Sequence, residues 1–310
     1  VIERHGAQRD GCSFGNAGMI VPSHFVPLAA PGMVKLGLKM MWHPESPFYI
    51  KPRWNGELFD WALKFWRAAN AEHVRRSAPL LRDLSFASRA LFEEFSGAPA
   101  SGPVCSKSES PTRRVGDRRS DGCDIGLTTR GLLMLCKTQH ALDDEAKFAA
   151  QANHLGVPAE VLNAQQVARL DPGVTMDVAG AVYFPKDAHF TPQRYMAAMQ
   201  RECEKVGVKF EWNTEVTQII SGKASFKVTK TLCGEPERVF KRERTAFARH
   251  VVRIEAVSTN NGEFSADEII LCGGSWSPLL VRELGLKIPI QAGKGYSLTL
   301  PQPRELPQLC

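Results

Sequence analysis

The stretch at 264–277 constrains the fold of this chain more than any other. It consists of a polar lead-in, the apolar run 269–272 and then the pair Gly273 and Gly274. A short apolar run bounded by turn residues predicts a strand that is buried on both faces of a sheet. Two glycines directly after it allow a ligand to approach the backbone at the carboxyl end of that strand. The stretch therefore predicts either a ligand-facing turn of an α/β sheet or an ordinary strand-to-helix turn.

The composition is typical of a globular protein with an apolar core. Of 310 residues, 43% are hydrophobic and 23% are charged. No uninterrupted apolar stretch is long enough to span a bilayer. The length predicts one large domain or two of ordinary size.

The formal net charge of +6 is partly concentrated in two arginine-rich runs, at 107–119 and 241–253. Neither run carries the interleaved aromatic residues that would stack on a single-stranded nucleic acid. We interpret both runs as solvated loops or faces and predict no nucleic-acid partner. A basic nucleic-acid-binding protein is the less favoured alternative.

The eight cysteines do not indicate a metal site. They form no C-x-x-C pair, and no cluster of histidine and cysteine has metal-ligand spacing. Several lie in apolar runs, where a reduced cysteine behaves as a small hydrophobic residue. The pattern predicts no metal and a reducing, cytoplasmic setting.

The first four residues, Val1, Ile2, Glu3 and Arg4, are typical of the end of a strand. An acid at the end of the second strand of a dinucleotide-binding unit binds ribose hydroxyls, about 20 residues after a G-x-G-x-x-G turn. Such a turn would lie upstream of Val1, and the proline-rich 302–310 ends as abruptly, so we expect an internal fragment of a longer protein. Taken alone, Glu3 is an ordinary surface acid.

A second candidate ligand contact is the segment 12–20, where small residues surround Ser13 and Asn16. Such a segment offers backbone N–H groups to a phosphate or to a ring carbonyl. It is equally consistent with a plain loop.

Helical periodicity is clearest at 58–70, which carries a stripe of aromatic residues. The stripe predicts a core-facing helix or, as the alternative, contact with a membrane surface.

The segment 96–121 is rich in Ser, Pro, Gly and Arg and predicts a disordered loop. The other predicted helices are 33–42, 78–95, 143–155 (capped by Asp143 or Asp144), 163–170, 192–206 (Thr191 cap, Pro192 first) and 277–284 (closed by Gly285).

Strand patterns follow the predicted helices. The helix 192–206 and the strand 208–212 predict half of a parallel-sheet unit. The later strands predict a β-meander with a hairpin turn at Asn261 and Gly262. The segment 126–138 is rich in strand-forming residues, with a turn near Gly131. The remaining predicted strands are 180–185, 215–220, 226–229, 251–254, 256–259 and 293–300.

Several segments, in their order along the chain, resemble the FAD-dependent D-amino-acid dehydrogenases, within the wider D-amino-acid oxidase family of flavoproteins. The similarity covers most of the chain and fails at 96–121 and 232–249, where this sequence carries additional residues. The segments that carry it are 1–4 (VIER), 13–18 (SFGNAG), 131–138, 184–189, 273–277 (GGSWS) and 289–297, which ends in GKGYS.

This resemblance implies a set of FAD contacts. Glu3 would bind the adenosine ribose, and Val216 would meet the adenine through its backbone. The other implied cofactor-binding residues are Arg4, then Ser13, Asn16, Ala17 and Gly18 at the pyrophosphate and flavin, and Gly273, Gly274 and Trp276 along the cofactor.

The implied fold class is α/β, with an incomplete FAD-binding Rossmann-like domain interleaved with an α+β substrate domain. The FAD-binding domain would comprise 1–45 and 189–285. The substrate domain, with a mixed or antiparallel sheet, would comprise 46–188 and 286–310. The family's phosphate turn would precede this sequence, and the rest of its substrate sheet would follow it.

The implied reaction is the FAD-dependent oxidative deamination of a D-amino acid to a 2-oxo acid, by hydride transfer to the flavin. The substrate carboxylate requires a cation, for which Arg53 and Arg130 are candidates. His189 is a candidate base or a structural histidine. Lys294 and Tyr296 would lie near the flavin ring.

The implied partners are a D-amino acid and an electron acceptor such as a quinone or the respiratory chain. Peripheral contact at the inner face of the membrane is the alternative to a purely cytoplasmic location. An inactive fragment is the alternative to an active flavoenzyme.

Overall fold

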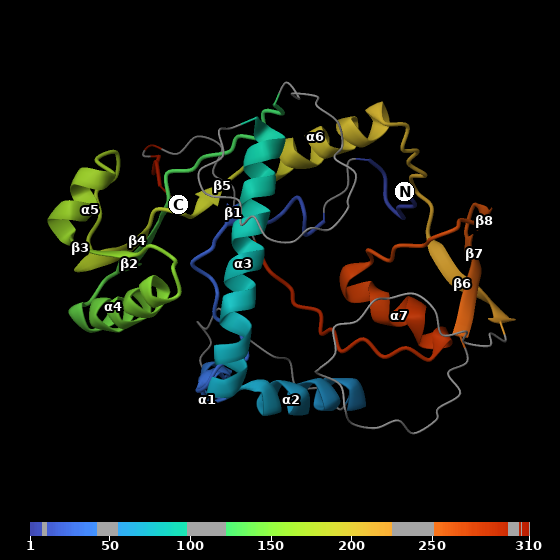
Figure 1. The fold of residues 1–310 in the computed structure, drawn as a ribbon, viewed down its shortest axis with the longest axis horizontal. Coiled ribbons are helices and arrows are strands. Elements are labelled where there is room, and N and C mark those ends of the chain that lie inside the picture. Colours follow the sequence, from blue (N-terminus) through green and yellow to red (C-terminus); the bar gives the residue numbers. More distant parts are fainter. Residues whose placement is uncertain are drawn as a thin grey trace, which may run out of the picture. The chain divides into compact units, whose positions relative to one another are not determined.

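A computed structural model of the chain describes residues 1–7, 11–41, 55–97, 122–224, 251–296, 304 and 306–309. The chain forms two compact units (Figure 1). Unit 1 contains Val1–Arg9 and Lys209–Gly293, and unit 2 contains Asp10–Val208 and Lys294–Cys310. Most of the predicted loop 96–121, the predicted strand 226–229 and Arg53 lie outside the described residues.

Unit 1 is built on a three-stranded antiparallel meander of β6 (Val216–Ala224), β7 (Val251–Thr259) and β8 (Gly262–Phe264). A tight turn joins β7 to β8, where Thr259 pairs with Gly262. The φ of Gly262 is 113°, which favours glycine. The predicted hairpin turn at Asn261 and Gly262 is therefore confirmed. The meander differs from its prediction, because the predicted strands 251–254 and 256–259 form the single strand β7 and are followed by β8.

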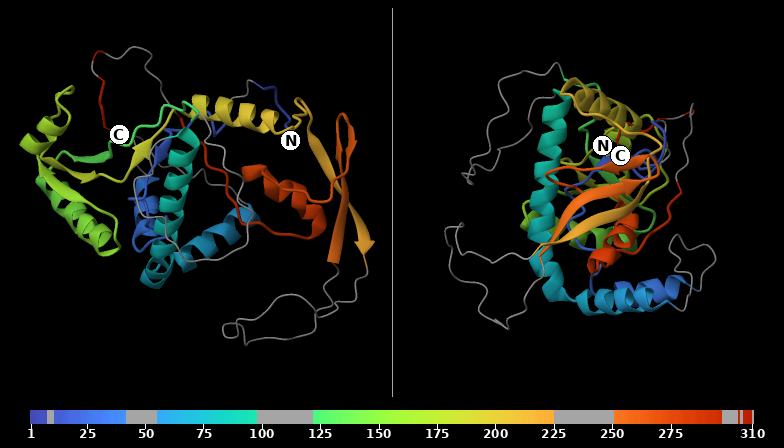
Figure 2. Two further views of the ribbon diagram at one scale, coloured as in Figure 1. Left: turned by 45° about the horizontal axis from the view of Figure 1, so that its top comes forward. Right: turned by 90° about the vertical axis from the view of Figure 1, so that its right-hand side faces the viewer.

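The hydrophobic core of unit 1 lies between the meander and helix α7 (Ser277–Val281), which lies beside β6 (Figure 2). Ile219 of β6, Val257 of β7 and Val281 of α7 form one buried cluster. Because strands alternate their side chains, these strand residues come from the one face of the meander that is covered.

A short 3-10 turn, η1 (Gly274–Trp276), precedes α7, and a second, η2 (Arg282–Leu284), follows it. The helical segment ends at Gly285, which has a φ of 71° and donates its N–H to the carbonyl of Arg282. The predicted short helix at 277–284, closed by this glycine, is confirmed.

The apolar run 269–272 is not a strand, which corrects the sequence-based prediction. Ile270 is 83% exposed, and no strand of the described residues pairs with the run. An apolar run is buried only where neighbouring strands and covering layers are present. In the described residues of unit 1, the parallel pairing consists of one bridge, between Ile2 and Glu211. The predicted strand 208–212 is therefore also not formed.

Unit 2 contains a second antiparallel sheet, in the order β2 (Leu132–Cys136), β4 (Gly180–Phe184) and β3 (Glu160–Asn163). Its central strand, β4, pairs along its whole length with β2. The sequence predicted β4 and the segment containing β2, whereas β3 was not predicted.

Two helices cover opposite faces of this sheet (Figure 1). α4 (Gln139–His154) packs against Val182, and α5 (Ala164–Leu170) packs against Ala181, the neighbouring residue of β4. Successive residues of a strand point to opposite faces, so the two helices bury alternate residues.

A two-stranded antiparallel ladder joins β1 (Met19–Ile20) to β5 (Ala188–His189). It lies beside α3 (Ala71–Ser96) and leads into α6 (Pro192–Lys205). Aromatic rings tie these elements together, with ring-centroid distances of 4.7 Å for Phe92–Phe190, 5.0 Å for Phe92–Tyr195 and 5.2 Å for Phe190–Tyr195. The ladder therefore rests on a packed aromatic support.

Helices α1 (Met33–Met40) and α2 (Gly56–Ala68) contain no buried residue. Asn55 caps α2 by accepting the N–H of Glu57. Both helices were predicted within a few residues of their observed bounds.

The observed starts of three helices can be compared with their predicted caps. In α4, a different polar residue occupies the capping position. α4 begins at Gln139 with Thr138 as its cap, five residues before Asp143, the first of the two predicted caps Asp143 and Asp144. The side chain of Thr191 makes no capping hydrogen bond on α6, although Pro192 is at the first position. α5 begins as predicted, with a capping box between Asn163 and Gln166.

The observed mixture of helices with antiparallel sheets agrees with the predicted fold class. The predicted domain boundaries, 1–45 with 189–285 and 46–188 with 286–310, stay a prediction, because compactness alone does not define which residues bind a cofactor.

The exposure of the run 269–272 leads to a stability prediction. Ile270→Thr should change the free energy of unfolding by less than about 0.5 kcal/mol, because the side chain is already in water. Val257→Ala should cost about 2 kcal/mol, because it opens a cavity in the core of unit 1. Urea unfolding of both variants measures this difference, and equal losses would contradict the described exposure.

Candidate functional site

In unit 1, backbone hydrogen bonds hold the N-terminal segment against the chain that follows Lys209. The N–H of Glu3 donates to the carbonyl of Glu211 at 3.0 Å, and the N–H of Thr214 donates to the carbonyl of Glu3 at 2.9 Å. Val216, the predicted adenine contact, begins β6 two residues later and packs on the same cluster as Ile2. These contacts place Glu3 beside the start of β6.

The side chains next to this segment are polar and aromatic. A carboxylate oxygen of Glu3 accepts the N–H of His5 at 3.1 Å. The guanidinium carbon of Arg4 lies 4.4 Å from the centroid of the Trp276 ring, which is a cation–π contact. The structure thus brings together two predicted cofactor residues that are far apart in sequence.

The predicted glycine pair of unit 1 forms the start of η1. Gly274 has a φ of 52°, and a Cβ atom placed on it would have nothing within 4 Å. The N–H of Trp276 donates to the carbonyl of Gly273 at 3.0 Å, and half of the Trp276 surface is exposed. The glycine turn therefore presents open backbone beside an exposed aromatic ring.

In unit 2, Asn16 closes the turn that the sequence singled out. Its side-chain amide donates to the carbonyls of Cys12 and Ser13 at 2.9 and 3.0 Å, and its oxygen accepts the N–H of Gly18 at 2.7 Å. Ser13, Asn16 and Ala17 are exposed, and Gly18 is buried. The side chain of Asn16 therefore shapes the backbone on which Ser13 and Ala17 are presented.

Gly18 lies at a very close approach of two segments. Its φ is 65°, and a Cβ atom would be 2.1 Å from the carbonyl oxygen of Phe190. The N–H of Phe190 donates to the carbonyl of Gly18 at 2.9 Å. Both the backbone conformation and the space require glycine at this position.

His189 lies in the same ladder, paired with Met19 and bridged to Thr128 through two backbone hydrogen bonds of 2.8 and 3.0 Å. Burial lowers the pKa of its imidazole. The side chain is therefore neutral at pH 7, which is the state in which an imidazole accepts a proton.

The other predicted catalytic residues are dispersed. Tyr296 is 89% exposed, and the amine of Lys294 lies 5.0 Å from its ring centroid. Arg130 is exposed, and its guanidinium donates to the side chain of Gln308. The structure brings none of these three against His189, and Arg53 lies outside the described residues.

Sequence reasoning missed a buried polar network next to the turn in unit 2. Asp187 is fully buried and accepts both the N–H and the hydroxyl of Ser23. Burial raises the pKa of the Asp187 carboxyl, and the hydrogen bonds from Ser23 and the charges of His24 and Arg89 oppose that rise. Asp187 lies in the segment 184–189, which carries part of the family resemblance. Its partner Ser23 is 164 residues away, so no local sequence pattern could identify the pair.

The polar and aromatic groups described in each unit have the chemistry that suits parts of a dinucleotide. The described parts of the chain contain no group of three or more His, Cys, Asp or Glu side chains that could hold a metal ion. Unit 1 offers an acid at a strand end, an open glycine turn and an Arg–Trp pair, and unit 2 offers a glycine-containing turn closed by Asn16. These groups fit ribose hydroxyls, phosphates and flat rings.

One family model matches almost the whole chain. It is the DAO family, described as FAD dependent oxidoreductase, and the match covers residues 1–309.

The most similar curated proteins include three named D-amino acid dehydrogenase. The protein of Bradyrhizobium diazoefficiens is 26% identical over 97% of this chain, that of Helicobacter pylori 26% over 99%, and that of Sinorhizobium medicae 27% over 97%. The chain spans 60%, 61% and 61% of the lengths of these relatives, respectively.

Solved structures are similar at a lower level. A glycine oxidase from Geobacillus kaustophilus aligns with a TM-score of 0.48 and 18% identity, covering 92% of this chain and 51% of its own. An L-amino acid deaminase from Proteus vulgaris aligns with a TM-score of 0.48 and 12% identity, covering 92% and 49%.

The close approach at Gly18 predicts a large and specific cost for adding one methyl group. Gly18→Ala should lower the free energy of unfolding by more than about 3 kcal/mol, because left-handed strain adds to a clash with backbone atoms. Gly207→Ala is the matched control: its φ is 88°, but nothing lies within 4 Å of the added Cβ, so its cost should be about 1–2 kcal/mol. Urea unfolding compares the two, and a Gly18→Ala variant as stable as Gly207→Ala would contradict the described packing.

Proposed function

Because this chain belongs to the DAO family of FAD-dependent oxidoreductases, we propose that it catalyses the FAD-dependent oxidative deamination of D-amino acids to 2-oxo acids. The observation that carries the proposal is the similarity to curated D-amino acid dehydrogenases along 97–99% of the chain. The chain spans about 60% of the length of those relatives.

Bound FAD would accept the hydride that leaves Cα of the amino acid, and it would pass the electrons to an acceptor. The substrate amine loses a proton in the same oxidation. Water then adds to the resulting C=N bond, which releases ammonia and the 2-oxo acid.

Each unit would contribute its own cofactor contacts. In unit 1, the Glu3 carboxylate would accept hydrogen bonds from the ribose hydroxyls and the Val216 backbone would contact the adenine. In unit 2, the turn closed by Asn16 would direct its backbone at the pyrophosphate and flavin. The other proposed contacts are Arg4, Gly273, Gly274 and Trp276 in unit 1 and Ser13, Ala17 and Gly18 in unit 2. The FAD-binding domain at 1–45 and 189–285 and the substrate domain at 46–188 and 286–310 are proposed on the same basis.

The substrate contacts are proposed from side-chain chemistry. Arg53 or Arg130 would pair with the substrate carboxylate, because a guanidinium binds it in a bidentate way. His189, which is neutral at pH 7, would accept the amine proton. Lys294 and Tyr296 would lie at the flavin ring and contact the substrate.

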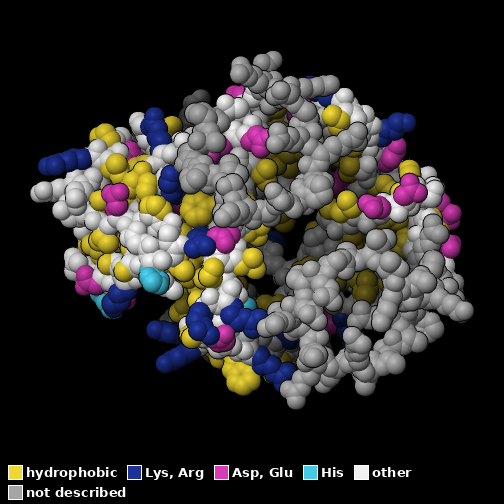
Figure 3. Space-filling view, viewed as in Figure 1, with side chains coloured by type: hydrophobic (Ala, Val, Ile, Leu, Met, Phe, Trp, Pro, Cys, Tyr) yellow, Lys and Arg dark blue, Asp and Glu magenta, His cyan; other side chains and the backbone are white. Residues whose placement is uncertain are grey.

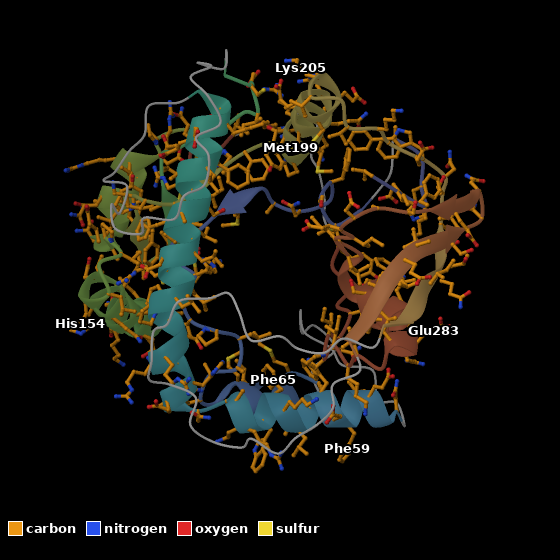
Figure 4. All side chains as sticks on the ribbon, turned by 45° about the vertical axis from the view of Figure 1, so that its right-hand side comes forward. Phe59, Phe65, His154, Met199, Lys205 and Glu283 are labelled. Atoms are coloured by element: carbon orange, nitrogen blue, oxygen red, sulfur yellow. The ribbon has the colours of Figure 1, made fainter. Side chains whose placement is uncertain are left out.

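We propose a quinone or another component of the respiratory chain as the electron acceptor, reached by peripheral contact with the inner face of the membrane. The membrane contact is supported by an exposed apolar face of α2. Its residues Phe59, Leu63 and Trp66, spaced at i, i+4 and i+7, are 76%, 39% and 62% exposed. These residues lie on one side of the helix, and Phe59 projects outward in Figure 4. An exposed apolar face of this kind is characteristic of an interfacial helix.

Basic residues accompany that face. Lys35 and Lys39 lie on α1, and Lys64 and Arg67 lie on α2, so anionic lipid headgroups would complement them. Figure 3 shows basic and hydrophobic side chains next to each other at the lower edge of the view, where these helices lie. Among the helices that the structure describes, none is long and apolar enough to cross a membrane.

The proposed chemistry predicts a flavin signal with stereochemical selectivity. The purified protein should bind FAD and quench its fluorescence, and anaerobic addition of D-alanine, but not of L-alanine, should bleach the flavin absorbance. Glu3→Ala should raise the Kd for FAD about tenfold or more, because it removes a charged acceptor from the ribose. Glu263→Ala, which removes an exposed acid of β8, should leave the Kd within about twofold.

A protein that neither binds FAD nor is bleached by any D-amino acid would contradict the proposed activity and favour the inactive alternative. A salt-sensitive retention on DNA, together with absence of FAD binding, would favour a nucleic-acid-binding function instead.

The α2 face predicts binding to anionic vesicles. Cosedimentation with phosphatidylglycerol-containing vesicles should fall at least about tenfold when Phe59, Leu63 and Trp66 are all replaced by Ser, because the buried apolar area is lost. The control replaces Leu80, Leu84 and Leu91 of α3 by Ser, since these leucines are 69%, 65% and 65% exposed. An equal loss in both variants, or no binding by the unmodified protein, would contradict the role of α2.

A further inference from the structure

We propose that Ser23 and Asp187 are positioning residues for FAD, because they fix the turn at 13–18 against β5. The inference rests on the proposed function, since it assigns these two residues to the binding of the same cofactor. Neither side chain would touch the cofactor, and both would act through the backbone of Gly18.

The pair is a short and fully buried contact. The hydroxyl of Ser23 donates to one carboxyl oxygen of Asp187 at 2.5 Å, and the N–H of Ser23 donates to the other at 3.1 Å. Ser23 is 1% exposed and Asp187 is 0% exposed. A buried carboxyl that accepts two hydrogen bonds is costly to disturb, because each lost bond leaves a polar group without water.

The pair closes one end of the β1–β5 ladder. Asp187 directly precedes β5, and Ser23 follows β1 by three residues. At the other end, the N–H of Phe190 donates to the carbonyl of Gly18. A ladder of two residue pairs has few bonds of its own, so fixed ends determine its geometry.

The surroundings of Asp187 give the pair further rigidity. The guanidinium of Arg89 on α3 donates to the carbonyl of Lys186, the preceding residue. Arg89 also forms a buried ion pair of 2.9 Å with Glu93. The imidazole of His24 lies 2.9 Å from the Ser23 hydroxyl oxygen. The pair therefore lies next to a contact that joins α3 to the residue before Asp187.

Gly18 transmits this constraint to the cofactor turn. Its carbonyl accepts the N–H of Phe190, the residue after β5, and its own N–H donates to the side chain of Asn16. A Cβ atom on Gly18 would meet the carbonyl of Phe190. A shift of β1 relative to β5 would therefore displace Asn16 and the exposed backbone around it. FAD affinity should follow, because hydrogen bonds to a phosphate depend on sub-ångström placement.

The experiment measures the Kd for FAD by fluorescence quenching in four variants of the full chain. Asp187→Ala and Ser23→Ala should each raise the Kd about tenfold or more. Asp187→Asn should stay within about threefold of the unmodified protein, because an amide can accept the N–H of Ser23 and donate to its hydroxyl oxygen. This rescue by the conservative variant separates positioning from a general requirement for charge.

Asp171→Ala is the matched control. Asp171 is 1% exposed, and one carboxyl oxygen accepts the N–H groups of Gln308 and Leu309 at 2.8 and 3.3 Å. Its loss should lower the melting temperature without changing the Kd for FAD. If Asp187→Ala and Ser23→Ala weaken FAD binding no more than this control does, the proposal is overturned.

The proposal remains testable if the unmodified protein does not bind FAD, an outcome that counts against the proposed function alone. Hydrogen exchange of the Phe190 amide in the FAD-free protein should then speed up in Ser23→Ala and stay unchanged in Asp171→Ala. Equal exchange in both variants would overturn the positioning role independently of any cofactor.

Discussion

The antiparallel contact between β1 and β5 is the interaction on which the candidate site of unit 2 depends. It joins segments that are far apart in sequence through only two residue pairs. Such a short ladder is marginal by itself. It persists because Gly18 allows the backbones to meet at one end and Asp187 binds Ser23 at the other. The turn at 13–18 is therefore closed locally by Asn16 and held against β5 by long-range contacts.

In unit 1, local sequence determines the turns but not all of the strands, since the predicted strands 208–212 and 269–272 are not formed. The turn at Gly262 and the short helix before Gly285 were predicted, because turn residues act over a few positions. The contact of Arg4 with Trp276 brings together two residues that only the family resemblance had connected. The cation–π contact itself was not predictable from motifs, because it joins the N-terminal segment to the turn after Gly273.

The parts that sequence reasoning missed depend on partners at a distance. The run 269–272 has the composition of a buried strand, but burial requires neighbours, and the described residues supply none that pair with it. Ser23 and Asp187 are ordinary residues until the fold brings them within 2.5 Å. The cap of α4 is Thr138 and not the predicted Asp143 or Asp144. Several polar residues near the helix start can act as caps, and capping preference alone does not rank them.

The central claim is that FAD binds to the segments singled out in both units. Amide hydrogen exchange of the protein with and without FAD tests it most directly. The account predicts slower exchange with FAD in 1–7 and 273–276 of unit 1 and in 11–20 of unit 2, with α5 unchanged. Protection confined to other segments, or no change on adding saturating FAD, would contradict it.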